Sequence, residues 1–445
     1  MPRRSLWHHG DFLRLWTAET ISQFGTQVSQ LAIPLVAALI LKVPPFEFAL
    51  LGVLEFLPFI LFSLPAGAWV DRLRRRPILI IGDLGRALSL ASIPVAFAFG
   101  ALTIWQLYVV GFVNGVLTVF FDVAYQSYLP SLVDRDQILE GNSKLEVSRT
   151  IAQTAGPTVG GALIGLISAP FAVVMDSLSF LGSAFFVWRI RSIEATPDRH
   201  TDEHGALREG LRSEVAAGLR YVLGNRYLRS IAACTGSSNL FSNIAFATFL
   251  LFVVQDLHLE PLTIGIVFGL GNLGALFGAT MANRIGGWAG VGPTVVGTAM
   301  LGGVAGLLVP MATPTLAVPL LIASSAIGGF CGVVYNITQV SFRQAITPAS
   351  MQGRMNATMR FIVWGTIPIG AIIGGALATS IGIHQTIWIG AILGLTPFLF
   401  VLLSPVRGLK EMPQPVGAVS DGPASVEARL GAVTDPDLEI AGDPR

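Results

Sequence analysis

Carboxyl and amide side chains that could bind protons or a small molecule occur inside long apolar stretches of this chain. Glu19, Gln23 and Gln27 recur at helical spacing, so they would share one polar stripe of an otherwise apolar helix. Glu55 lies near the middle of the next apolar stretch. An ionised, unpaired carboxylate in hydrocarbon costs several kcal/mol, so each glutamate must be protonated, paired or hydrated. A carboxylate with these options can take up a proton on one side of a membrane and release it on the other.

Two interpretations are open for these carboxylates. Glu19 is either a proton or cation site on a cavity wall, or it pairs with a basic neighbour between helices. Glu55 is either a proton-coupling site or a member of a static ion pair. Arg86 is a conceivable partner for Glu55, but Asp83 precedes that arginine by one helical turn and is the nearer candidate. For Asp176 we expect a structural hydrogen bond.

The composition places these residues in a membrane protein. Of the 445 residues, 52% are apolar and 12% are charged, whereas soluble domains carry about 25% charged residues. This excludes a soluble enzyme, and the net charge of +1 gives no field that would attract a nucleic acid. Cys234 and Cys331 lie in apolar stretches, so we expect no disulfide framework, metal site or cofactor. No phosphate-binding Gly-Lys-Ser/Thr loop is present, which excludes ATP hydrolysis by this sequence.

Twelve stretches are long enough to cross a bilayer, which needs about 20 mostly apolar residues per helix. They lie near 15–41, 46–70, 78–99, 102–124, 147–168, 170–188, 231–254, 262–282, 290–311, 315–338, 361–381 and 385–404. With these spans, 26 of the 28 Lys and Arg residues fall in the loops and tails on one side. Because basic loops stay in the cytoplasm, we expect a multi-pass cell-membrane protein with both termini cytoplasmic.

The chain repeats itself after six spans. Residues 160–163 and 374–377 both read Gly-Gly-Ala-Leu, and Asn142 matches Asn356 at the same offset of 214 residues. We therefore predict an all-α integral membrane fold of twelve transmembrane helices in two pseudo-symmetric six-helix bundles, a transporter architecture. The predicted parts are a first bundle over 1–190, a cytoplasmic linker with a surface helix over 191–226, a second bundle over 227–404, and a disordered cytoplasmic tail over 405–445.

Three motifs carry a resemblance to a known family. The segment Gly67-Ala-Trp-Val-Asp71-Arg72-Leu-Arg-Arg75-Arg-Pro resembles the loop 2–3 signature of the major facilitator superfamily. Gly156-Pro157-Thr-Val-Gly160-Gly161 is similar to the span-five motif of its antiporters. The sequences at 82–87 and 176–181 are similar to those of the branch that contains enterobactin exporters and macrolide-efflux proteins.

The resemblance implies roles for these residues. Gly67, Asp71, Arg72 and Arg75 with Asp122 would form a latch that closes the cytoplasmic side. The alternative is that the arginines of this loop only anchor the topology against anionic headgroups. The motif of span five would form a tight helix contact typical of export by exchange, or else only a packing kink. Spans one, four, seven and ten would line the cavity.

The second half offers neutral polar groups for the cavity. Asn239 and Asn243 lie on span seven, and Tyr335 and Asn336 lie on span ten. Carboxylates in one half and amides in the other suit an amphipathic or weakly basic organic substrate. We therefore expect a monomeric secondary transporter that exports a drug, a macrolide-like compound or a siderophore in exchange for protons, with membrane lipid around it. Uptake or facilitated flux of a metabolite or lipid, and a non-transporting receptor or assembly protein, are the alternatives.

Overall fold

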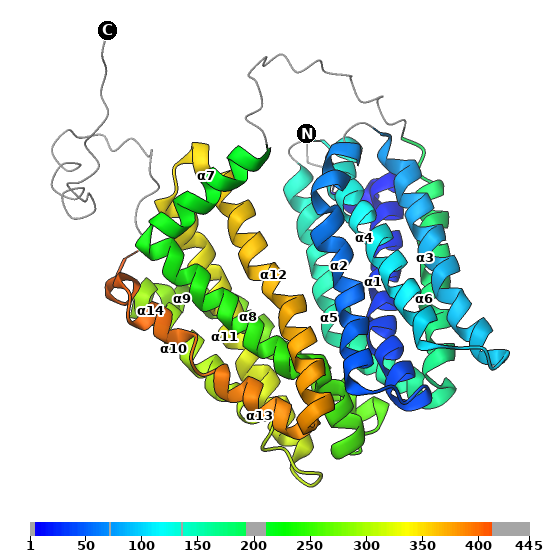
Figure 1. Cartoon of the computed structure of the whole chain (residues 1–445). Helices are drawn as coiled ribbons and strands as arrows, with labels where there is room; N and C mark the ends of the chain where they lie inside the picture. Colours follow the sequence, from blue (N-terminus) through cyan, green and yellow to red (C-terminus); the bar gives the residue numbers. More distant parts are fainter. Residues whose placement is uncertain (1–4, 71–72, 135–136, 193–210, 412–445) are drawn as a thin grey trace.

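The computed structural model describes residues 5–70, 73–134, 137–192 and 211–411, and these form helices joined by short connections (Figure 1). The first half contains α1 Gly10–Leu35, α2 Pro45–Val70, α3 Arg75–Ala98, α4 Ile104–Leu132, α5 Ile138–Ile167 and α6 Ala169–Trp188. After α7 Leu211–Gly224, the second half contains α8 Arg226–Leu251, α9 Pro261–Ala289, α10 Val291–Gly306, α11 Ala317–Ile346, α12 Ala349–Ile381, α13 Ile383–Leu393 and α14 Phe398–Leu402.

The number of spans agrees with the sequence prediction. Eleven segments of the described residues are long and apolar enough to cross a membrane, and α10 is a shorter apolar helix of 16 residues. The last span consists of α13 and α14, which are separated around Pro397, a residue that cannot continue the hydrogen-bond ladder of a helix. The predicted all-α fold with twelve transmembrane helices is confirmed.

Several helices are longer than their apolar stretches. α5 begins at Ile138 rather than near 147, and α12 begins at Ala349 rather than near 361. The added turns are polar and carry residues such as Glu140 and Gln352. Hydropathy detects only the part of a helix that needs hydrocarbon, so it missed the water-exposed turns.

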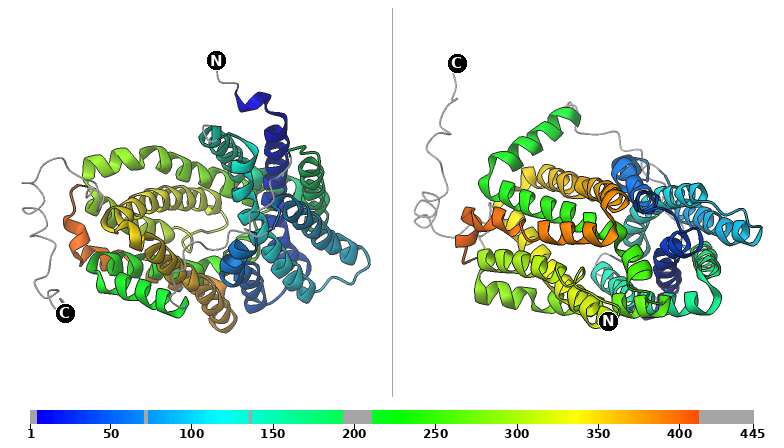
Figure 2. Two further views of the ribbon diagram at one scale, coloured as in Figure 1. Left: turned by 90° about the horizontal axis from the view of Figure 1, so that it is seen from above. Right: turned by 60° about the horizontal axis from the view of Figure 1, so that its bottom comes forward.

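The two halves pack against each other through two pairs of helices, each with one helix from either half. α5 lies along α9, and α2 lies along α12 (Figures 1 and 2). Since α9 is the repeat counterpart of α2 and α12 is that of α5, the two contacts are related by the internal repeat. The backbone shows the same repeat. Lys42 and His258 both have positive φ, as do Ser168 and Gly382, at offsets of 216 and 214 residues. Segments of π-helix follow α1 at Val36–Ile40 and α8 at Phe252–Asp256.

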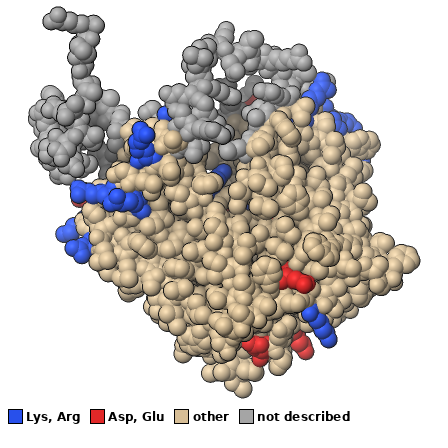
Figure 3. Space-filling model, viewed as in Figure 1, with Lys and Arg blue, Asp and Glu red and all other residues tan. Residues whose placement is uncertain are grey.

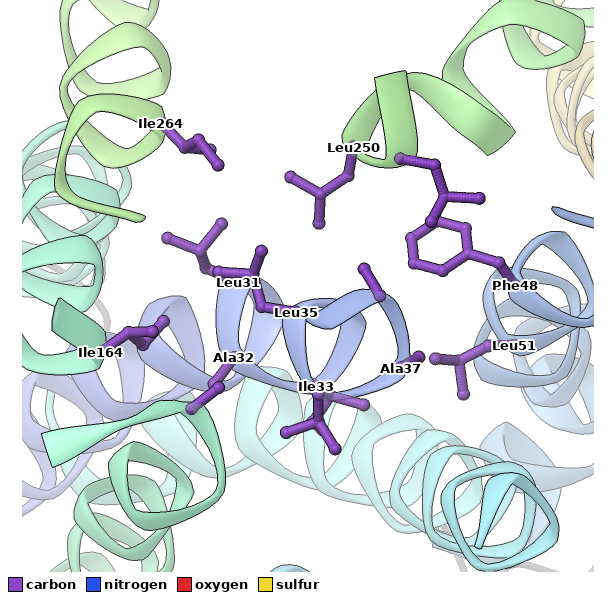
Figure 4. Close-up of a cluster of buried hydrophobic side chains, with 14 of the residues drawn as sticks. Leu31, Ala32, Ile33, Leu35, Ala37, Phe48, Leu51, Ile164, Leu250 and Ile264 are labelled. Atoms are coloured by element: carbon purple, nitrogen blue, oxygen red, sulfur yellow. The ribbon is translucent and has the colours of Figure 1, made fainter. Parts of the chain in front are cut away.

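One end of the molecule is sealed by a buried apolar cluster, which we call the closed-end cluster (Figure 4). It includes Leu31 and Leu35 of α1, Phe48 of α2, Leu250 of α8 and Ile264 of α9, so both halves contribute. These residues lie near the end where α1 finishes and α9 begins. The opposite end, where α1 and α5 begin, is called the open end below.

The segments outside the bundles differ partly from the predictions. A linker helix is present as α7, and Gly218 of α7 packs against the backbone of Arg354 on α12. The predicted start of this helix near Leu207 lies outside the described residues. The tail was predicted to be disordered from 405, and this is wrong for its first residues. Pro405–Gly408 form a 3₁₀ turn with Val406 fully buried, because this valine covers apolar surface of the second half. The remaining tail, 412–445, is outside the described residues.

Candidate functional site

A cavity of about 1300 Å³ lies in the first half. Its lining comes from α1 to α6, with Leu276 of α9 as the contribution of the second half. Glu146 and Ser143, in the first turns of α5, are exposed at its mouth. The start of α5 is bonded to the start of the chain, since Glu140 accepts hydrogen bonds from Ser5 and from the backbone of Leu6. The cavity therefore opens at the open end and ends against the closed-end cluster, to which its lining residues Ile33, Leu90 and Phe180 belong.

The polar stripe of α1 forms one wall of this cavity. Glu19, Gln23 and Gln27 all line it. Gln23 Nε2 donates to Glu19 Oε1 over 2.7 Å, and Glu19 Oε2 is buried without a hydrogen-bond partner among the described residues. Glu19 is thus held by a neutral amide and forms no ion pair with a described basic residue.

Glu55 reaches the same cavity from α2. No hydrogen bond or ion pair of Glu55 is formed within the described part of the chain. Its space is provided by two glycines of α4: a Cβ at Gly111 would lie 2.8 Å from Glu55 Cγ, and one at Gly115 would lie 2.8 Å from the Glu55 carbonyl oxygen. Two glycines one helical turn apart therefore let α4 approach α2 closely and leave the carboxylate facing the cavity.

Arg86 of α3 is held by three neighbours. Its guanidinium donates to Asp83 Oδ1 over 2.6 Å, and both side chains are almost fully buried. The guanidinium carbon lies 4.1 Å from the ring centroids of Phe121 and Phe180. The local pair with Asp83 anticipated from the sequence is present, so Arg86 does not pair with Glu55. Cation–π contacts of this kind are strongest where water is excluded.

Asp176 of α6 faces the cavity but is only 1% exposed. Ser179 Oγ donates to Asp176 Oδ1 over 3.0 Å, in line with the expected structural hydrogen bond. Gly25 of α1 leaves room for this carboxylate, since a Cβ there would lie 2.5 Å from Asp176 Oδ1. With Arg86 and Asp176, α3 and α6 also contribute to the cavity, which the expected set of lining helices did not include.

The latch predicted for the open end is only partly described. Asp71 and Arg72 lie outside the described residues, and a Cβ at Gly67 would have open space around it. Asp122 lines the cavity, and it is absent from the ion pairs formed between described residues. The ion pair between Asp122 and Arg75 is therefore not seen in this conformation, and the latch stays a prediction.

The motif of α5 makes backbone-close contacts on two sides. A Cβ at Gly156 would lie 2.5 Å from Gln27 Cβ, and one at Gly160 would lie 3.2 Å from Val28 Cα, both on α1. Gly161 meets the backbone of Pro261 at the start of α9, and Gly265 of α9 meets the backbone of Pro157. These small residues bring α5 against both α1 and the second half.

The residues predicted for the second half are divided between two environments. Asn243 and Tyr335 line a separate pocket of about 480 Å³ among α8 to α11 and α13. Asn239 instead donates to the carbonyl oxygen of Val363 on α12 over 3.1 Å. Asn336 accepts a hydrogen bond from Gln339 over 3.1 Å. Neither of these two asparagines is among the residues that line the two cavities.

A comparison with family models decides the classification. Residues 5–433 match the model described as transmembrane secretion effector. The chain belongs to this family, within the major facilitator superfamily. The resemblance seen in the sequence motifs is therefore confirmed, and the protein is a multi-pass membrane transporter.

Curated relatives of this transporter include drug exporters. The multidrug efflux pump Tap of Mycolicibacterium fortuitum is 28% identical over 347 residues, covering 74% of this chain and 80% of that protein. Macrolide efflux protein A of Streptococcus pyogenes is 22% identical over 382 residues, covering 84% of this chain and 91% of that protein.

Solved structures share the fold of this transporter. An inward-facing bacterial homologue of the iron transporter ferroportin superimposes with a TM-score of 0.72 at 15% identity, covering 90% of this chain and 99% of that one. The outward-facing structure of a bacterial ferroportin homologue gives a TM-score of 0.52 at 15% identity, covering 88% and 98%.

Sequence reasoning missed the residues of the transporter that shape the space around its carboxylates. Gly111 and Gly115 hold Glu55, and Phe121 and Phe180 cover Arg86. The two glycines of α4 had a usable signal, because small residues four apart in a span indicate a close helix contact. The phenylalanines had none, since an aromatic residue in a span is ordinarily lipid-facing or core.

Proposed function

We propose that this transporter exports a small amphipathic or weakly basic organic molecule in exchange for protons, by alternating access between its two halves. The observation that carries the proposal is the acidic cavity, which is open at one end and contains an unpartnered glutamate near mid-span. Membership of the family shows that the protein is a transporter. The acidic lining of the cavity supports our proposals of proton coupling and of the substrate class.

The charge balance of the cavity supports proton exchange. Glu146 and Arg149 line the mouth of the cavity and form an ion pair with each other over 3.8 Å. Deeper in or beside the cavity, Arg86 is the one basic residue against five carboxylates: Glu19, Glu55, Asp83, Asp122 and Asp176. Holding five negative charges near one positive charge in a medium of low dielectric constant is costly, so protons or a cationic ligand must offset the excess. When protons and substrate compete for the same groups, binding of one releases the other, which is exchange.

The charge distribution supports a cytoplasmic open end. On the face shown in Figure 3, most of the Lys and Arg residues gather toward the open end, whereas the acidic residues visible lower down lie toward the closed end. By the positive-inside rule, the cavity then faces the cytoplasm, where a substrate for export would enter. The higher similarity to the inward-facing ferroportin homologue agrees with this assignment.

The names of the relatives support the substrate class. Tap is a multidrug efflux pump and macrolide efflux protein A is named for macrolides. Drug-like molecules combine an apolar body with a basic or polar group, and the acidic cavity suits the basic group. We therefore propose drug-like compounds, including macrolide-like ones, as the exported class.

Transport of a fluorescent cationic dye, ethidium, into inside-out vesicles tests this proposal. An imposed pH gradient, acidic inside, should drive ethidium uptake by the wild-type chain. Glu55→Gln and Glu19→Gln should each reduce this gradient-driven uptake by about tenfold or more, because a neutral amide cannot exchange a proton. Glu47→Gln, at the start of α2 and outside both cavities, is the matched control and should transport normally.

Two results would contradict the proposal. Wild-type vesicles that move no ethidium in response to the gradient would argue against proton-driven export. Full gradient-driven uptake by both glutamine variants would show that neither carboxylate carries the exchanged proton.

A further inference from the structure

The pocket of the second half has a lining of opposite character to the acidic cavity. It measures about 480 Å³, and every residue that lines it is uncharged. Seven of its lining residues are glycines, contributed by α10, α11, α13 and the residue that follows α13: Gly302, Gly303, Gly306, Gly328, Gly332, Gly390 and Gly394. Because glycine has no side chain, these seven positions leave the space of the pocket unfilled.

The internal repeat identifies what this pocket corresponds to in the first half. At an offset of 216 residues, Ser22 corresponds to Ser238 and Gln27 to Asn243; the first of each pair lines the acidic cavity and the second lines this pocket. The same offset relates the starts of α3 and α10, and an offset of 214 relates the starts of α6 and α13. The pocket is thus the counterpart of the acidic cavity, built on the repeat-related helices.

At the corresponding positions on and just after α10 and α13, the second half has small residues where α3 and α6 have charges and a ring. α4 and α11 match at an offset of 214: the contact of Gly115 with the carbonyl oxygen of Glu55 recurs as that of Gly329 with the carbonyl oxygen of Gly271. Gly302 is the counterpart of Arg86, and a Cβ there would lie 3.5 Å from Cys331 Cβ. The replacements on and just after α10 and α13 are Asp83 by Ala299, Arg86 by Gly302, Asp176 by Gly390 and Phe180 by Gly394.

Aromatic rings line one side of the pocket, from the exposed Phe246 to Phe249 and Phe268. Phe246 and Phe249 of α8 are stacked with ring centroids 6.2 Å apart, and Phe268 of α9 meets Phe249 edge-on at 5.9 Å. Ile387 of α13 belongs to the closed-end cluster, and Phe249 and Phe268 pack against that cluster. The floor of the pocket is therefore apolar and lies against the sealed end.

We propose that this pocket binds the neutral aromatic or aliphatic part of the transported molecule, while the acidic cavity binds its basic part. The proposal rests on the proposed function and specifies its substrate site. The polar wall of the pocket, Ser238, Ser242 and Asn243, argues for an occupant that enters from the aqueous space between the halves, because lipid tails cannot satisfy these groups. The pocket lining carries no charge and the first cavity is acidic, so an amphipathic molecule has a distinct site for each of its parts.

The open space beside two glycines of α11 allows a direct test. A Cβ at Gly328 or Gly332 would meet nothing within 4 Å, so leucine at either position fills the pocket without a backbone clash. Leucine also favours a helix more than glycine does, so these substitutions should not prevent folding. Gly297 of α10 has the same open surroundings but is outside the pocket, which makes Gly297→Leu the matched control.

Binding of rhodamine 6G, a planar aromatic cation, is measured by fluorescence polarisation on the purified full chain in nanodiscs. We expect Gly328→Leu and Gly332→Leu to raise the Kd by at least about tenfold and Gly297→Leu by less than about twofold. Native mass spectrometry of the same samples records any retained phospholipid. This binding assay needs no gradient, so it separates failure of the pocket from failure of proton-driven export in the vesicle assay.

Three results would overturn the proposal. In the first, both pocket variants bind rhodamine 6G as tightly as Gly297→Leu does. In the second, a phospholipid retained by the wild type is lost from the pocket variants while the Kd stays the same, which identifies a lipid site. In the third, the wild-type chain does not bind rhodamine 6G.

Discussion

At the scale of single residues, the guanidinium of Arg86 combines a 2.6 Å hydrogen bond to Asp83 with two ring contacts at 4.1 Å. Arg86→Met should lower the free energy of unfolding by about 3–5 kcal/mol, because Asp83 would be left buried without its counter-charge. Adding Asp83→Asn should recover most of that loss, since removing both charges leaves none unpaired. Thermal unfolding of the purified chain measures both variants. A double variant no more stable than the single one would mean that the two side chains are not coupled.

The sequence predicted some of these residues from spacing alone, and the reason is local geometry. Glu19, Gln23 and Gln27 share one face of any helix, and Asp83 and Arg86 are one turn apart, so their arrangement follows from the helix itself. The environments of Asn239 and Asn336 depend on which neighbouring helix lies opposite them. Asn239 bonds to α12, a contact between elements more than a hundred residues apart, which no local pattern encodes.

At the scale of elements, apolar length located the spans, but it did not give the ends of the helices. α5 and α12 begin one or more turns before their apolar stretches, and these turns bring polar residues such as Glu146 of α5 to the mouth of the cavity. The pocket of the second half was also not predicted. Glycines in a span indicate close packing as readily as an empty space, and only the positions of the neighbouring helices distinguish the two.

Asp11 in the first turn of α1 holds the end of the first half. It accepts hydrogen bonds from the backbone nitrogens of Arg191 over 3.1 Å and Ser192 over 2.9 Å, just after α6. Asp11→Ala removes this acceptor at a cost of about 1–3 kcal/mol, so limited trypsin digestion should cleave after Arg191 about fivefold faster or more. Asp11→Asn keeps an oxygen at the same place and should be cleaved at a rate closer to that of the wild type. Equal cleavage rates for the alanine variant and the wild type would show that this contact does not restrain the segment.

At the scale of the whole molecule, the repeat places a close contact between a glycine and a neighbouring backbone at two points of the closed end. A Cβ at Gly161 would lie 3.1 Å from Leu262 Cα at the start of α9, and a Cβ at Gly375 would lie 3.1 Å from Phe46 Cα at the start of α2. Each glycine therefore lets a helix of one half approach the other half at the sealed end. If the halves move against each other in transport, both contacts must separate when the closed end opens.

Gly161→Val and Gly375→Val should each shift the transporter toward a state that is open at the closed end. Overpacking of a helix contact costs about 1–3 kcal/mol, which corresponds to roughly a tenfold change in the population of the sealed state. The measurement is labelling of Leu257→Cys, a position buried in the closed-end cluster, by a membrane-impermeant maleimide in whole cells expressing a chain whose native cysteines are replaced by alanine. Gly165→Val, on α5 with open space around it, should leave the labelling rate unchanged. If the valine variants are labelled no faster than this control, the two glycine contacts do not hold the closed end together.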